Sequence, residues 1–347
     1  MRAILPGFAF AVALAAAAKG LSFASGGMVS AILCAIALGI LWRNLVELGA
    51  WAEPGLEFTG QTLLRIGIAL IGLRLTWLVL TETGMTALPV VIACISVALM
   101  VTVGFGKLLG VGAGIRRLLA AGTAICGCTA IIAIAPLVRA QKADIGIAIT
   151  CVVVFGSIAM VGYPWLAGAV FGTEAMPAGM FFGASIHDTS QVVGAALIYA
   201  DQYHSPDAVA IAGFTKFLRT FGLLVLVPAA AMWMARSESE TAASEPRDLR
   251  RRAVPWFVIV FILLAGVRAA GDYLAGGAEW QGLWQQTLAG AQRVSELLLL
   301  CGMAAVGLGI TFSHLREAGW RPVLLSFLAA LVTGACALGM IRLYGAV

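Results

Sequence analysis

Polar and ionisable side chains interrupt an apolar stretch at residues 177–200, where the sequence reads SIHDTSQ from Ser185 to Gln191. An ionisable group inside a membrane helix costs about 2.5–3.5 kcal/mol even on lenient scales, so each one calls for a function or a partner. The imidazole of histidine titrates near physiological pH, and a neighbouring carboxylate can shift that titration. We therefore predict that His187 and Asp188 carry a coupling proton. A structural hydrogen-bond network between helices is the alternative interpretation.

A second stretch, residues 121–136 (AGTAICGCTAIIAIAP), gathers glycine, hydroxyl and thiol side chains inside an apolar run and ends at Pro136. Non-helical backbone at membrane depth survives only where protein buries it or where it lines a watery cavity. The pattern predicts a broken helix at a binding site; the alternative is a small-residue face for helix packing. The candidate substrate ligands in the two stretches are Thr123, Cys126, Gly127, Cys128, Thr129, Ser185 and Gln191.

Two arginines, Arg65 and Arg219, fall near the middle of other apolar segments. Arginine offers a planar fork of donors that matches the oxygens of an anion. Both residues are candidate anion ligands, and ion pairs with Asp188 or Glu296 are the equal alternative. The positive end of a half-helix that starts after Gly127 would also favour an anion.

The composition is that of an all-α, polytopic membrane protein. Of the 347 residues, 61% are hydrophobic and 11% are charged, whereas soluble proteins carry about 25% charged residues. The net charge of +5 does not indicate nucleic-acid binding, because the basic residues lie between apolar runs. The seven cysteines all fall in apolar segments and the three histidines are scattered. We therefore predict no disulfide framework, no metal site and no cofactor beyond a coupling H⁺ or Na⁺.

Apolar segments of the length that a membrane helix needs recur along the chain. Since about 20 apolar residues span a bilayer, about eleven spans are predicted, at 4–20, 27–43, 58–78, 85–106, 117–139, 144–171, 177–200, 207–234, 254–275, 285–311 and 322–344. The charged segment 236–252 is predicted to be a cytoplasmic loop. Lysine and arginine favour the cytoplasmic side, and their distribution predicts a cytoplasmic N-terminus, with Lys19, Arg139 and Lys142 as exceptions.

Weak matches between the two halves of the chain indicate an internal repeat. Gly27-Met28 corresponds to Gly179-Met180, and Arg65 corresponds to Arg219. Five spans per unit is an odd number, so the two units must be inverted, which is a transporter architecture. The predicted division is an extra N-terminal helix at 1–26, a first five-helix repeat at 27–172 and a second repeat at 173–347. The broken fifth span then corresponds to the tenth, which has its own small residues at Cys301, Gly302, Gly307 and Gly309 and is predicted to be broken as well.

These motifs together resemble the sulfate exporter family of YeiH-like bacterial membrane proteins. The resemblance covers nearly the whole chain from the second span onward and rests on GTAICG from Gly122 with Ala135-Pro136, GASIH from Gly183 followed by QVV, RIGIALIGLRLT from Arg65, GLG from Gly307 and AGWRP from Ala318. It implies the fold of the superfamily of cation:proton antiporters, bile-acid symporters and anion transporters, in which broken helices cross in a mobile core. Two departures are Asp188, where the family often has glutamate, and Cys128-Thr129, where small apolar residues usually follow.

The resemblance and the polar motifs together predict a secondary active transporter in the bacterial inner membrane. The expected cargo is a small anion such as sulfate or an organosulfur acid, exported with proton coupling by an elevator-like movement of the core. A sodium-coupled anion symporter or an anion channel is the alternative. A membrane-embedded enzyme is disfavoured because no nucleophile elbow is present. The expected partners are the small anionic solute, the lipid bilayer and a second copy in a homodimer.

Overall fold

The structure is a computed structural model that describes residues 3–26, 29–46, 48–237, 255–274, 278–311 and 318–344. Over these residues it contains helices and connecting turns, without a strand. Most of the predicted loop 236–252 lies outside the described residues, and its first two residues end a helix. Seven helical stretches of the described chain are long and apolar enough to cross a membrane. The prediction of an all-α, polytopic membrane protein is therefore confirmed, and the count of about eleven spans stays a prediction.

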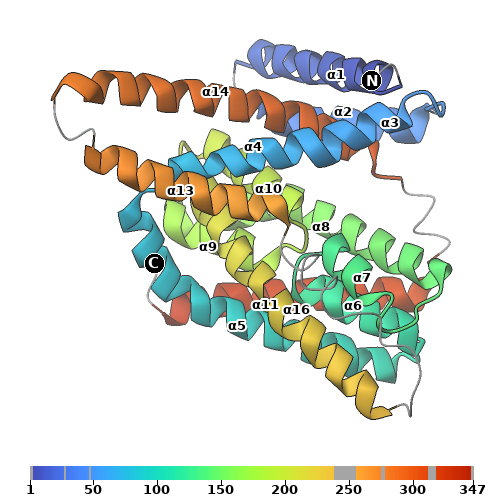
Figure 1. Cartoon of the computed structure of the whole chain (residues 1–347). Helices are drawn as coiled ribbons and strands as arrows, with labels where there is room; N and C mark the ends of the chain where they lie inside the picture. The colour runs from blue at the N-terminus through green and yellow to red at the C-terminus, as the bar shows by residue number, and fades with distance from the viewer. Residues whose placement is uncertain are drawn as a thin grey trace.

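One layer of helices lies at the top of Figure 1. This upper layer consists of α1 (Leu5–Ala24), α2 (Ala31–Leu45), a continuous stretch made of α3 (Glu53–Glu57), η1 (Phe58–Leu63), α4 (Leu64–Leu70) and η2 (Ile71–Arg74), and the two helices packed on it, α13 (Trp256–Leu274) and α14 (Ala278–Leu308). Small residues bring these helices together. A side chain at Gly39 would meet the backbone of Ala304 at 2.8 Å, so α2 and α14 touch backbone to backbone.

The remaining helices form a lower layer. They are α5 (Trp77–Leu108), α6 (Ala113–Ala124), α7 (Cys128–Ile134), α8 (Lys142–Phe171), α9 (Ala175–Ser185), α10 (Thr189–Gln202), α11 (Asp207–Ser237) and α16 (Trp320–Leu343). The α5 and α16 helices pack against each other along the bottom of Figure 1. Near the interface between the layers, α10 contacts α2 and α4.

The predicted break in 117–139 is confirmed, and the two pieces form a hairpin that enters the protein and turns back. A Cβ at Gly114 would lie 2.4 Å from the Asp144 carboxylate, and one at Gly122 would touch Val152 at 3.1 Å. The α6 and α8 helices therefore run side by side in the same direction. Because α7 lies between them in sequence, it returns the chain to the end where α6 began.

A second hairpin enters from the opposite end and is formed by α9 and α10. A Cβ at Gly179 would meet Ile211 at 2.8 Å, and one at Gly183 would meet Thr215 at 2.6 Å, so α9 runs parallel to α11. At the end of α10, the Tyr199 hydroxyl donates to the Gly172 carbonyl oxygen at 2.8 Å. Both ends of this hairpin thus lie at one end of the molecule, and its break, at residues 186–188, falls on the polar motif.

The predicted break in the tenth segment, 285–311, is wrong. The α14 helix runs unbroken from Ala278 to Leu308. Its small residues serve close packing instead, because a Cβ at Gly302 would meet Leu64 at 2.7 Å and one at Gly307 would meet the Ile36 carbonyl oxygen at 2.5 Å. The two broken stretches are consecutive in the chain, in 117–139 and 177–200, rather than five spans apart.

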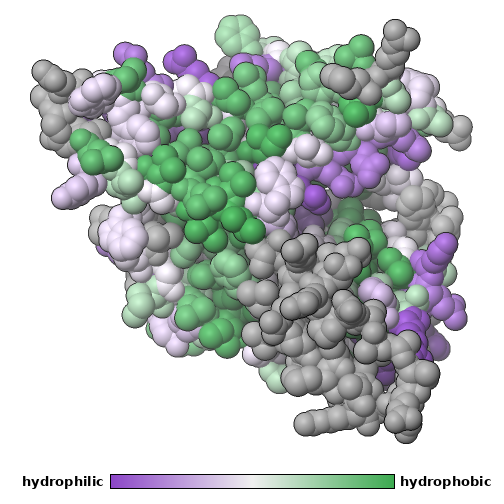
Figure 2. Space-filling view, in the orientation of Figure 1, coloured by the Kyte–Doolittle hydropathy of each residue, from purple (hydrophilic) through white to green (hydrophobic). Residues whose placement is uncertain are grey.

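The surface of the molecule suits a bilayer. Figure 2 shows a broad apolar area over the middle of the visible face. Large apolar residues are exposed on α13, including Ile259, Ile262 and Leu263. Apolar patches of this kind on a helical protein are where lipid chains replace water.

Candidate functional site

A cavity of about 610 Å³ lies where the tips of both hairpins meet the upper layer. Five of the predicted site residues line it: Arg65, Cys128, Thr129, Asp188 and Gln191. Further polar lining comes from Arg43, Glu53, Glu57, Gln61, Thr189 and Ser190. Over the described residues there is no group of three or more histidine, cysteine, aspartate or glutamate side chains that could hold a metal ion. The cavity therefore offers hydroxyls, amides, carboxylates and two guanidinium groups for binding.

Gly127 lets the tip of the first hairpin approach the tip of the second. Its φ of 65° lies in the left-handed region, where a side chain would be strained. A Cβ at this position would also come within 3.1 Å of an Asp188 carboxylate oxygen. The two breaks therefore abut, which brings Cys128 and Thr129 to the same cavity as Asp188.

Asp188 is the N-cap of α10. Its Oδ1 accepts a hydrogen bond from the Ser190 backbone N–H at 2.9 Å and another from the Ser190 hydroxyl at 2.5 Å. A capping aspartate satisfies a backbone donor that the helix leaves unpaired. Since the carboxylate also lines the cavity and is half-buried, it can serve both as a cap and as a group that meets solute or protons.

Gln191 is positioned by α8. Its Nε2 donates to the Val153 carbonyl oxygen at 2.8 Å and to the Ser157 hydroxyl at 3.1 Å. The amide lies directly over Gly156, where a Cβ would come within 1.9 Å of Oε1. Oε1 itself is buried and has no hydrogen-bond partner among the described residues. A glycine is therefore required beneath this side chain.

Arg65 is the candidate arginine that lines the cavity. Its guanidinium carbon lies 5.7 Å from the centre of the Phe257 ring, a cation–π distance. The predicted alternative of an ion pair with Asp188 or Glu296 is not what the described structure contains. Asp188 bonds to Ser190, and Glu296 pairs with Arg74 at 2.6 Å.

Arg219 lies behind the hairpin tips and is fully buried. Its Nε donates to the Ala124 carbonyl oxygen at 2.8 Å and its Nη1 to the Ala184 carbonyl oxygen at 2.5 Å, and further bonds reach the carbonyls of Thr123 and Ile186. These carbonyls belong to the last turns of α6 and α9, which carry partial negative charge. The guanidinium thus holds both hairpins together instead of lining the cavity.

Lys216, one turn before Arg219, also joins the two hairpins through their backbone carbonyls. It was not among the predicted site residues. Its ammonium donates to the carbonyl oxygens of Ile125 at 3.0 Å, Ile186 at 2.8 Å and His187 at 2.5 Å. Two cations three positions apart on an otherwise apolar helix were the signal in the sequence. The identity of their partners could not be read from it, because backbone carbonyls leave no mark on the sequence.

The other predicted ligands are buried around the tips and do not line the cavity. The Thr123 hydroxyl donates to the Leu119 carbonyl oxygen at 2.7 Å, and the Ser185 hydroxyl donates to the Phe181 carbonyl oxygen at 2.5 Å. Cys126 is also buried. His187 is 2% exposed, and its Nδ1 has no hydrogen-bond partner in the part of the chain that the structure describes. The described structure contains no hydrogen bond between His187 and the Asp188 carboxylate.

Comparison with known proteins agrees with the resemblance in the motifs. A family model described as "Conserved hypothetical protein 698" matches residues 6–326. The chain belongs to this family. The UPF0324 membrane protein TauZ of Paracoccus denitrificans is 33% identical over 96% of this chain and 95% of its own length. The UPF0324 inner membrane protein YeiH of Escherichia coli K12 is 28% identical over 91% of this chain and 87% of its own length. The protein described here has several apolar helices and belongs to the same family. It is therefore a multi-pass inner membrane protein.

Proposed function

We propose that this protein is a secondary active transporter that exports a small anion, such as sulfate or an organosulfur acid. The observation that carries the proposal is the cavity at which two hairpins, inserted from opposite ends, present Thr129, Asp188 and Gln191 beside Arg65. Irregular backbone at membrane depth is the usual setting of a transporter binding site. Membership in a family of membrane proteins is consistent with transport.

Binding of the anion would rest on Arg65 and on the hydroxyl of Thr129. Lys216 and Arg219 lie behind the tips, and among the described residues their hydrogen-bond partners are backbone carbonyls. Their positive charge raises the potential at the tips, since the low dielectric of the interior screens it little. The upper layer would serve as the scaffold, and the hairpins would move against it in an elevator-like cycle.

Cation coupling is supported by carboxylates in the same cavity, namely Asp188, Glu53 and Glu57. A carboxylate beside a bound anion is a natural carrier of H⁺, and oxygen ligands of this type also suit Na⁺. We propose H⁺ as the coupling ion, with sodium-coupled symport as the second candidate. Dependence of uptake on pH in sodium-free buffer supports the first, and dependence on sodium at constant pH supports the second.

The experiment is exchange in proteoliposomes loaded with unlabelled sulfate and diluted into labelled sulfate, repeated with sulfite and taurine. We expect saturable exchange in the wild type and about a tenfold higher half-saturation concentration in Arg65→Gln, because a hydrogen bond to a charged group contributes about 1.5–3 kcal/mol. The control is Arg321→Gln, an exposed arginine that stacks on Trp320 outside the cavity. Flux that never saturates and shows no exchange would indicate a channel. Equal exchange in wild type and Arg65→Gln would refute the role of Arg65.

A further inference from the structure

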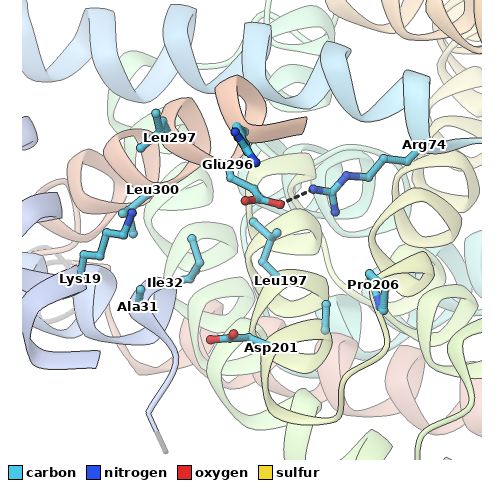
Figure 3. Close-up of a pocket in the computed structure, with 12 residues that line it drawn as sticks. Lys19, Ala31, Ile32, Arg74, Leu197, Asp201, Pro206, Glu296, Leu297 and Leu300 are labelled. Atoms are coloured by element: carbon cyan, nitrogen blue, oxygen red, sulfur yellow. Dashed lines mark hydrogen bonds and ion pairs between the residues drawn. The ribbon is translucent and has the colours of Figure 1, made fainter. Parts of the chain in front are cut away.

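A second cavity, of about 570 Å³, lies at the opposite end of α10. Residues of α1, α2, η2, α10 and α14 surround it (Figure 3). Three of its lining residues are close to helix ends: Ala31 at the start of α2, Arg74 at the end of η2 and Asp201 near the end of α10. Arg293 and Glu296 lie near the middle of α14. The end of α10 lies at one end of the molecule, where the Tyr199 hydroxyl donates to the Gly172 carbonyl oxygen.

The charges in this cavity are not balanced by one another. Three cations, Lys19, Arg74 and Arg293, face two carboxylates, Glu296 and Asp201. Glu296 forms an ion pair with Arg74, whose Nη2 donates to its carboxylate at 2.6 Å, as the dashed line in Figure 3 marks. Lys19 and Arg293 are exposed and form no ion pair in the described structure. Among the described lining residues, Asp201 alone remains to offset these two cations.

The rest of the lining is apolar and continues onto an exposed apolar face of α14. It comes from Ala31, Ile32, Leu197, Ala200, Pro206, Leu297 and Leu300. Leu297 is 54% exposed, and Val294 on the same helix is 50% exposed. An opening onto such a surface admits an alkyl chain, while free cations at its rim attract a negatively charged head group.

We propose that this cavity binds an anionic phospholipid, with the phosphate between Lys19 and Arg293 and an acyl chain along Ile32 and Leu297. The shared chemistry is that of an oxyanion, which a free phosphate could also supply. The apolar lining favours the lipid, because a free phosphate would gain nothing from it.

The test is thermal unfolding of the purified full chain in detergent. We expect phosphatidylglycerol to raise the unfolding midpoint by several degrees more than phosphatidylcholine does. In the double variant Lys19→Gln/Arg293→Gln, this difference should fall by at least about half, because the lost charge attraction is local. The matched control is Arg342→Gln, an exposed arginine at the end of α16 outside the cavity. It should respond as the wild type does.

Two results would overturn the proposal. One is an equal phosphatidylglycerol effect in the wild type and the double variant. The other is a shift of the same size with inorganic phosphate alone, which would make the cavity a free-oxyanion site. The double variant should unfold at the wild-type midpoint in phosphatidylcholine, since neither residue has a partner to lose among the described residues. Sulfate exchange is measured separately, so failure of the lipid proposal leaves the transport proposal standing.

Discussion

Single buried cations hold the two hairpins in place. Lys216 and Arg219 donate to carbonyls at the ends of α6 and α9, where each helix leaves acceptors unpaired. Hydrogen bonds from charged donors are stronger than neutral ones. The stability of the site therefore depends on two side chains that substrate would not touch.

We expect Lys216→Met to destabilise the protein by at least about 2 kcal/mol, because the buried carbonyls of Ile125 and His187 lose their donor at about 1–3 kcal/mol each, while the Ile186 carbonyl keeps its bond from Arg219. The measurement is the unfolding midpoint in detergent, which should fall by several degrees. Lys107→Met, at the exposed end of α5, is the control and should unfold as the wild type does. A midpoint unchanged in Lys216→Met would show that the ammonium is not what joins the hairpins.

The two predicted proton carriers occupy different surroundings. Asp188 lines the cavity and His187 is buried behind it. We expect Asp188→Asn to flatten the pH dependence of anion exchange, because an amide cannot carry the proton. His187→Gln is the second arm and should keep the wild-type profile. A flat profile in His187→Gln alone would assign the proton to the imidazole instead.

At the scale of elements, glycines on one helix leave space for side chains of the helix packed against it. Gly156 on α8 leaves room for Gln191 of α10. We expect Gly156→Ala to displace Gln191 and abolish exchange, at a stability cost of about 1–3 kcal/mol from overpacking. Gly162→Ala on the same helix meets no atom within 4 Å and should leave exchange unchanged. Normal exchange in Gly156→Ala would mean that Gln191 does not help to form the site.

The first break could be predicted from sequence because its residues are individually poor helix formers in an apolar context. Gly127 with its positive φ is the clearest example. The second break was missed, because its polar residues were assigned to a continuous span at 177–200, and the partner of the first break was placed in the tenth segment. Small residues mark both broken backbone and tight helix packing, and Gly302 and Gly307 serve packing. Composition alone does not separate these two uses.

The hairpins also resemble spans in length and apolar content, so hydropathy cannot tell a segment that crosses from one that turns back. The useful signal was charge. Arg139 and Lys142 were exceptions to the distribution of basic residues. In the fold they follow a hairpin that returns to the end where Lys107 and Arg116 lie, which removes both exceptions.

At the scale of the whole molecule, the hairpins fix which loops share a membrane face. In a background whose seven cysteines are replaced by serine, we expect Gly112→Cys and Gln141→Cys to react from the same side with a membrane-impermeant maleimide. Thr173→Cys should react only from the other side. All three residues are exposed. Labelling of Gly112→Cys and Gln141→Cys from opposite sides would show that the segment 117–139 crosses the membrane instead of turning back.

The positions of Lys216 and Arg219 have an electrical consequence. Both charges belong to the lower layer, and hydrogen bonds tie them to its hairpins. If that layer moves as proposed, the charges move with it through the membrane field. One elementary charge carried across the whole field is worth about 2.3 kcal/mol per 100 mV. The membrane potential would then act on the protein itself, so the return of the empty carrier would depend on voltage even when the transported solute is electrically neutral.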